Sequence, residues 1–216
     1  MDIEFARQQM VDQQVRSWDV IDHQVLSIMR QIPRETFMPE GWQDCAYVDR
    51  GLPLADGQIT FSPKLEGRFL QALQLTGNEV CLEIGTGCGY LTACLAALSQ
   101  RVVSLEQSAT LATTASATLS ALQITNAKVE HASAPTGLPD QSFDVVVAGG
   151  SVRHHLASLE QKLVIGGRAI VVVDEGVVMS AQRITRISND HWLRESLFET
   201  SLPPLIGFGP EPAFSF

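Results

Sequence analysis

The chain of 216 residues is 45% hydrophobic and 18% charged, which is enough apolar material for a substantial buried core and excludes a low-complexity disordered protein. Its formal net charge of -9 repels polyanions and no cluster of lysines and arginines offsets it, so we expect no nucleic-acid partner. The N-terminus lacks a basic stretch followed by an apolar one, and no segment is long enough to cross a bilayer, so we expect a cytoplasmic protein with no membrane partner.

The first part of the chain predicts helices followed by irregular structure. Residues 2–32 have apolar side chains at helical spacing, and Pro33 ends that run. Residues 39–63 contain several glycines and prolines and no long periodic segment. We therefore expect residues 1–63 to form a helical extension to a compact core formed by residues 64–216.

From residue 64 onward, helical and strand-like segments alternate. Helical spacing is found at 64–75, 90–98, 109–122 and 154–163, and strand-like apolar runs at 80–84, 101–105, 128–131, 143–148 and 168–173. Repeated strand–helix units of this length predict an α/β fold with a Rossmann-like, doubly wound and mostly parallel sheet. Two late strands, at 182–187 and 193–198, predict an antiparallel hairpin with its turn at 188–190.

A glycine-rich turn follows the first of these strands and leads into a helix. Glycines allow a backbone to approach a ligand closely, and the start of the helix offers free N–H groups. A pyrophosphate-binding turn has the spacing G-x-G-x-x-G, whereas an acid before G-x-G-x-G suits a ligand with a cationic amino group. The candidate ligand-binding residues here are Glu83, Gly85, Thr86, Gly87 and Gly89.

A second acid ends the next strand. Glu106, which Gln107 follows, comes about twenty residues after the turn, where a carboxylate can accept both hydroxyls of a ribose. The turn and the two acids together favour a positively charged nucleoside without phosphate. S-adenosylmethionine carries an ammonium and a sulfonium group and is the predicted cofactor. NAD(H) is the alternative, and the glycine spacing counts against it.

These residues resemble those of a class I methyltransferase, and the wider chain resembles the protein-L-isoaspartate O-methyltransferase family. The resemblance extends from about residue 7 to about residue 205. The segments that carry it are Met10-Val11, IPRETF at 32–37, Ala46-Tyr47, LPL at 52–54, Gly57-Gln58, Pro63, LEIGTGCGY at 82–90 and GGR at 166–168.

The resemblance implies an enzyme of protein repair. Such an enzyme uses S-adenosylmethionine to methylate the carboxylate of an L-isoaspartyl residue in a damaged peptide or protein, and the ester then closes to a succinimide. Residues 1–63 would contribute to the substrate side. A carboxylate is already nucleophilic at pH 7, so proximity and alignment can supply most of the rate.

Two segments depart from the family pattern. The family carries G-Q-T-I-S-x-P with its serine hydroxyl in the active site, whereas residues 57–63 read GQITFSP, with Phe61 at the serine position. Hydroxyls remain at Thr60 and Ser62, the candidate catalytic residues, although a shift of one residue along an extended segment reverses the direction of a side chain. The family's Gly-Asp-Gly is also missing, and Ser133 is the candidate contact to the adenine. We expect a retained cofactor site and an altered acceptor site.

Several other residues leave alternatives open. His154 and His155 could be acid–base groups or metal ligands, although a surface or capping role is favoured. Asp144 could line the cofactor pocket or stabilise the start of its strand. The aromatic residues Phe208, Phe214 and Phe216 could form a packed terminus or a peptide-binding lip.

No metal site is predicted, because the four cysteines form no CxxC pair and no His/Cys cluster has zinc-like spacing. Two alternative functions follow from the departures. One is a methyltransferase of the same fold whose acceptor has diverged toward a less polar or smaller molecule. The other is a non-catalytic protein that retains the cofactor pocket.

Overall fold

Short apolar runs form the strands of one mixed sheet. The computed structural model describes residues 2–134, 136–153 and 156–208, and within them the strand order is β3-β2-β1-β4-β5-β6-β7. The strands are β1 (Val80–Ile84), β2 (Arg101–Glu106), β3 (Ala127–His131), β4 (Phe143–Val152), β5 (Leu163–Asp174), β6 (Met179–Ser188) and β7 (His191–Glu199). Strands β1 to β5 pair in parallel, whereas β6 is antiparallel to both β5 and β7. The predicted Rossmann-like α/β fold and the late hairpin are thus confirmed.

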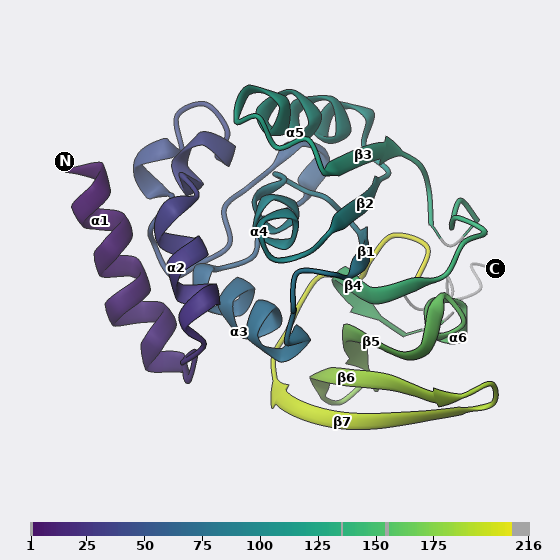
Figure 1. Cartoon of the computed structure of the whole chain (residues 1–216). Helices are drawn as coiled ribbons and strands as arrows, with labels where there is room; N and C mark the ends of the chain where they lie inside the picture. Colours follow the sequence, from purple (N-terminus) through teal and green to yellow (C-terminus); the bar gives the residue numbers. More distant parts are fainter. Residues whose placement is uncertain (1, 135, 154–155, 209–216) are drawn as a thin grey trace.

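Helices cover both faces of this sheet (Figure 1). The helices that flank it are α2 (His23–Gln31), α3 (Pro63–Leu73), α4 (Tyr90–Leu98), α5 (Ala109–Ala121) and α6 (Leu156–Glu160). Helices α3 and α4 pack on one face with α2 outside them, and α6 packs on the other. Side chains alternate along β4, so that Val145 and Val147 join the core under α3 and α4, while Val146 and Ala148 join the core beside α6.

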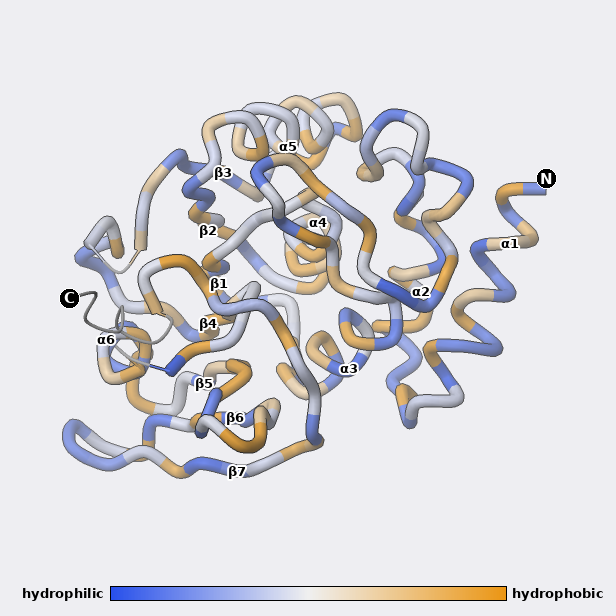
Figure 2. The backbone as a smooth tube through the Cα atoms, turned by 180° about the vertical axis from the view of Figure 1, so that it is seen from behind, coloured by the Kyte–Doolittle hydropathy of each residue, from blue (hydrophilic) through white to orange (hydrophobic). Residues whose placement is uncertain are grey.

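Hydrophobic segments concentrate in the middle of the molecule. Figure 2 shows them in α4 and in the central strands, whereas the turn between β6 and β7 is hydrophilic. This is the pattern of a parallel sheet buried on both faces. Within the residues that the structure describes, no helix combines the length and the apolar character needed to span a bilayer.

The helical character expected over residues 2–32 is confirmed, with one interruption at residues 19–22. Helix α1 (Ile3–Gln9) continues into a π-helical turn (Met10–Val15) and a 3₁₀ turn (Arg16–Trp18), and then the chain reverses. Asp19 adopts a left-handed conformation with φ of 59°, and the carboxylate of Asp22 caps α2 by accepting from the amides of Gln24 and Val25. Two successive aspartates therefore end one helix and start the next.

The expected irregular segment before α3 is confirmed, apart from short 3₁₀ turns such as Gln43–Cys45 and Ala55–Gly57. Its last part folds back on itself, since the amide of Thr60 donates to the carbonyl of Leu52 at 2.8 Å. Buried residues from this segment and from α2 belong to the same core as α3 and α4. The division at residue 63 stays a prediction.

Three late segments differ from their predicted bounds. The strand predicted at 143–148 continues to Val152, the helix predicted to end at 163 ends at Glu160, and β5 begins at Leu163 rather than 168. The predicted roles of His154, His155, Phe214 and Phe216 concern positions outside the described residues. Phe208 is fully buried in the core beside α6.

Candidate functional site

A cavity of about 320 Å³ lies at the carboxyl ends of β1, β2 and β4. Ligands of doubly wound sheets bind at this edge, because the loops after parallel strands converge there. The lining consists of residues 58–61, 83–88, 105–108 and 202–206, with Asp56, Glu66, Leu91, Ala132, Ala134, Gly149 and Gly150. Four of these side chains are carboxylates, and none of the described lining residues is a lysine, arginine or histidine.

The predicted glycine turn forms one wall. Gly85, Gly87 and Gly89 have φ values of +91°, +56° and +88°, which side-chain-bearing residues rarely adopt. Gly85 and Gly87 line the cavity together with Thr86, whereas Gly89 lies just behind them as the N-cap of α4. A Cβ on Gly149, within β4, would lie 2.6 Å from the carbonyl oxygen of Gly85, so only glycine allows this approach.

Glu106, the second predicted acid, also lines the cavity. Its Oε2 accepts from the amide of Gly87 at 2.8 Å, and its Oε1 accepts from the amide of Ser108 at 2.9 Å. Each carboxylate oxygen has a further lone pair, so Glu106 can still accept from a ligand. Gln107 lines the cavity beside it.

Glu83 is fully buried at the end of β1. Its Oε2 accepts from the hydroxyls of Thr92 at 2.5 Å and Ser104 at 2.6 Å, whereas its Oε1 has no hydrogen-bond partner among the described residues. Burial raises the pKa of Glu83 to about 7, the two hydroxyls oppose this shift, and the nearby charge of Glu106 adds to it. A buried carboxyl with one unsatisfied oxygen is poised to receive a cation or a donor.

Only one of the two candidate catalytic residues belongs to the cavity lining. Thr60 lines the cavity, and its Oγ1 accepts from the amide of Leu52 at 3.0 Å. Phe61 lines the cavity as well, with its ring 5.3 Å from that of Phe69 in an edge-on contact. Ser62 is not part of the lining and forms the N-cap of α3.

Ser133, the candidate adenine contact, is exposed and is not part of the lining. Its neighbours Ala132 and Ala134 are, so the described wall at this corner is apolar. Asp144 lies at the opposite end of the sheet, where its carboxylate accepts from the amide of Val80 at 2.8 Å.

Sequence reasoning missed two parts of the cavity. Segment 202–206 lines it and is held beside β4 by paired backbone bonds of 2.8 Å between Ser151 and both Pro203 and Leu205. No sequence motif in residues 202–206 predicts that this segment lines the cavity. Glu66 also lines the cavity, and here a signal existed, because Glu66 shares the helical spacing of the buried residues Phe69, Leu70 and Leu73.

The comparisons with known proteins agree with one another. Residues 6–207 match the model of the protein-L-isoaspartate(D-aspartate) O-methyltransferase family. Protein-L-isoaspartate O-methyltransferase 1 of Rhodopseudomonas palustris (strain HaA2) is 40% identical over 95% of this chain and 87% of its own length, and the protein-L-isoaspartate O-methyltransferase of strain ATCC BAA-98 / CGA009 is 35% identical over 94% and 96%.

A solved structure shares the fold. It is a crystal structure from Plasmodium falciparum, described as a protein-L-isoaspartate O-methyltransferase in complex with S-adenosyl-L-homocysteine. It superposes with a TM-score of 0.77 at 21% identity and covers 92% of this chain and 97% of its own. At this identity the likeness supports the fold alone.

Proposed function

The chain belongs to the protein-L-isoaspartate(D-aspartate) O-methyltransferase family, and from this membership we propose that it transfers a methyl group from S-adenosylmethionine to the carboxylate of isoaspartyl residues. Its proposed partners are then damaged peptides and proteins, and its proposed location is the cytoplasm. Two protein-L-isoaspartate O-methyltransferases that are 40% and 35% identical to this chain support the assignment.

One observation supports S-adenosylmethionine as the cofactor: the described lining of the cavity has four carboxylates and no basic side chain. A pyrophosphate would be repelled by these acids and would meet no cationic side chain in the described lining, whereas a ligand with an ammonium and a sulfonium would be attracted. The unsatisfied oxygen of Glu83 and the backbone cradle at Gly85 and Gly149 fit the same ligand. The residues proposed to hold the cofactor are Glu83, Gly85, Thr86, Gly87, Gly89, Glu106, Gln107 and Ser133, of which Gly89 and Ser133 are the weaker candidates because they lie outside the lining.

The proposed chemistry asks little acid–base work of the protein. The cofactor, when bound, supplies a methyl group on a positively charged sulfur. The acceptor carboxylate is ionised at pH 7, so the protein must mainly align it and exclude water. Thr60 can contribute, because its hydroxyl accepts from Leu52 and keeps its own hydrogen to donate. Ser62, which is not part of the lining, is the weaker of the two candidates.

A second candidate function is favoured by Phe61. Its ring forms part of the lining at the position where the family serine would supply a hydroxyl, and Ile59 and Leu202 to Ile206 add further apolar surface. An acceptor of lower polarity than an isoaspartyl peptide would suit this wall. The shared prediction of both functions is methyl transfer from the same cofactor.

The deciding experiment measures methyl transfer to an isoaspartyl peptide beside its aspartyl twin, with wild type and with Phe61→Ser. We expect transfer to the isoaspartyl peptide alone, and a gain in kcat/KM for the variant that restores a hydroxyl. Calorimetric titration with S-adenosylhomocysteine is the control. Cofactor binding without transfer to either peptide would reject isoaspartyl repair and favour the diverged acceptor. A silent titration would reject both functions.

A further inference from the structure

Glu66 is a second buried carboxyl on the cavity wall. It lies on α3 with 2% of its surface exposed, and its Oε1 is 3.3 Å from a guanidinium nitrogen of Arg34. Its Oε2 has no hydrogen-bond partner among the described residues. Glu66 and Glu83 thus line one cavity from α3 and β1, and each has one buried oxygen without a donor.

Arg34 does not neutralise both carboxyls. The nitrogen that approaches Glu66 also donates to the carbonyl of Phe61 at 2.7 Å, and the guanidinium lies 4.9 Å from the ring centre of Tyr90. If Glu66 and Glu83 are both ionised, the group carries one excess negative charge out of water. Such a charge is costly unless a proton or another cation joins it.

The other groups around Glu66 leave this balance unchanged. Cys88, Tyr90 and Cys94 face it from the turn and from α4, and burial raises the pKa of each, to about 11 for Cys88, so they are neutral near pH 7. Burial also raises the pKa of Glu66 to about 7, Arg34 opposes the shift and Glu83 adds to it. Burial and mutual repulsion therefore favour a proton on one of the two carboxyls near neutral pH when no cation is bound.

We propose that Glu66 joins Glu83 in binding the ammonium group of the methionine part of the cofactor, and that this cation displaces a proton from the two carboxyls. The inference rests on the proposed cofactor and names a binding residue that the glycine-turn pattern does not contain. Two carboxylates from different elements that line one cavity, each with an oxygen that has no donor among the described residues, can accept several N–H donors of one ammonium.

Proton counting tests the proposal in the wild-type protein. The heat of S-adenosylhomocysteine binding is measured near pH 6.5 in buffers of different ionisation enthalpy, where the ligand's amino group is charged. We expect each bound ligand to release about one proton. The affinity should also rise with pH through the range in which the two carboxyls titrate. Proton uptake would overturn the proposal, because it would mean that a protonated Glu66 donates to the ligand's carboxylate. Absence of any proton exchange would overturn it as well.

A pair of ligands then separates Glu66 from the rest of the site. For Glu66→Gln we expect S-adenosylhomocysteine to bind about tenfold more weakly, as for a lost charge-assisted hydrogen bond, and the proton release to fall. Methylthioadenosine, which has no ammonium group, should bind within about twofold of wild type, since it keeps only the nucleoside contacts. Equal losses for both ligands would contradict the proposal and indicate a merely structural role.

The matched control is Glu160→Gln. Glu160 is also buried and pairs with Arg194 at 2.6 Å, but it lies in α6 and is not part of the cavity lining. It should leave both affinities unchanged. A cooperative thermal unfolding transition shows whether each variant is folded. The proton count is measured on the wild-type protein, so it does not depend on the folding of any variant. If wild type bound neither ligand, the proposed cofactor itself would be wrong, whereas binding without proton release would reject only the role of Glu66.

Discussion

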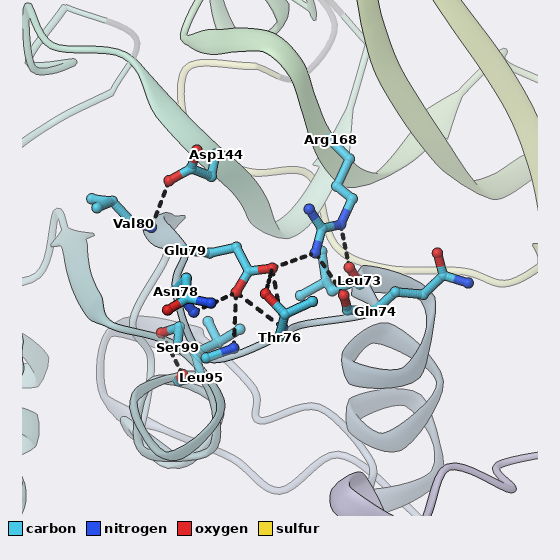
Figure 3. A network of polar contacts seen from close by, with 11 residues as sticks. Leu73, Gln74, Thr76, Asn78, Glu79, Val80, Leu95, Ser99, Asp144 and Arg168 are labelled. Atoms are coloured by element: carbon cyan, nitrogen blue, oxygen red, sulfur yellow. Dashed lines mark hydrogen bonds and ion pairs between the residues drawn. The ribbon is translucent and has the colours of Figure 1, made fainter.

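Two glutamates at the two ends of strand β1 have opposite surroundings. Glu79, just before the strand, accepts from the amides of Thr76, Gly77 and Asn78 at 3.0–3.1 Å and from Arg168 at 3.0 Å (Figure 3). Arg168 in turn donates to carbonyls at the end of α3, which ties that helix to β5. Both carboxylate oxygens of Glu79 are satisfied. Glu83, by contrast, has one satisfied oxygen and one without a partner among the described residues.

The difference assigns a structural role to Glu79, whereas for Glu83 we propose a binding role. Although burial alone would raise it, hydrogen bonds from Arg168 and Thr76 hold the pKa of Glu79 below its ordinary value. The pKa of Glu83 is raised to about 7 because its desolvation is not fully compensated. A folded protein satisfies the acids that hold it together and leaves open those that a ligand will complete. The following substitutions test this distinction.

The largest effect is expected for Glu79→Ala. The change leaves three backbone amides and a partly buried guanidinium without their acceptor, so the free energy of unfolding should fall by about 3–5 kcal/mol. Urea denaturation measures the fall. Because the folded-state pKa of Glu79 is lowered, its contribution is present above its ordinary pKa of 4.5 and is lost as the pH falls below that value. The difference in the free energy of unfolding between the variant and wild type should therefore become smaller at acidic pH.

Calorimetry with S-adenosylhomocysteine provides the control for that variant. Glu79 lies at the opposite edge of the sheet from the cavity, so the affinity of the folded protein should stay close to that of wild type. A large loss of affinity with little loss of stability would reverse the roles assigned to the two acids.

Glu83→Gln should raise the free energy of unfolding, whereas Glu79→Ala should lower it. The folded-state pKa of Glu83 is raised from 4.5 to about 7, so the stability associated with its protonated form is present below pH 4.5 and is lost as the pH rises through about 7. The glutamine stays neutral, and without ligand the variant should exceed wild type by about 2–3 kcal/mol at pH 8 and by little at pH 5. Denaturation at the two pH values measures this, and equal differences would contradict an unsatisfied Glu83.

Glu106→Ala tests the second corner of the cavity. We expect cofactor binding to weaken by about 1–3 kcal/mol through loss of a charge-assisted hydrogen bond, measured by titration with S-adenosylhomocysteine. Glu130→Ala, which removes a surface acid paired with Lys128 on β3, is the control and should have no effect. Unchanged affinity of Glu106→Ala would show that the ribose assignment is wrong.

The same contrast explains how much could be predicted from the sequence. The turn at Gly85 and Gly87 was predictable, because backbones with positive φ select glycine at fixed local spacing. The sheet was predictable from the alternation of apolar strands and helices. The pairing of Glu66 with Arg34 was not, because the partners are far apart in sequence and meet only when α3 packs. Segment 202–206 likewise reaches the cavity through backbone bonds that leave no side-chain pattern.

The smallest effect is expected for Thr60→Val. Thr60 is intermediate between the fully hydrogen-bonded Glu79 and the partly unsatisfied Glu83. The hydroxyl of Thr60 already accepts from Leu52, as a structural group does, but its own hydrogen is directed to no acceptor among the described residues. Valine keeps the shape, so the free energy of unfolding should fall by only about 1 kcal/mol, for the unpaired amide of Leu52. If the remaining hydrogen serves the acceptor, kcat/KM for the isoaspartyl peptide should fall about tenfold, while Thr60→Ser keeps both stability and turnover. The loss of stability without a loss of kcat/KM would assign Thr60 to the class of Glu79, as a group that the fold alone requires.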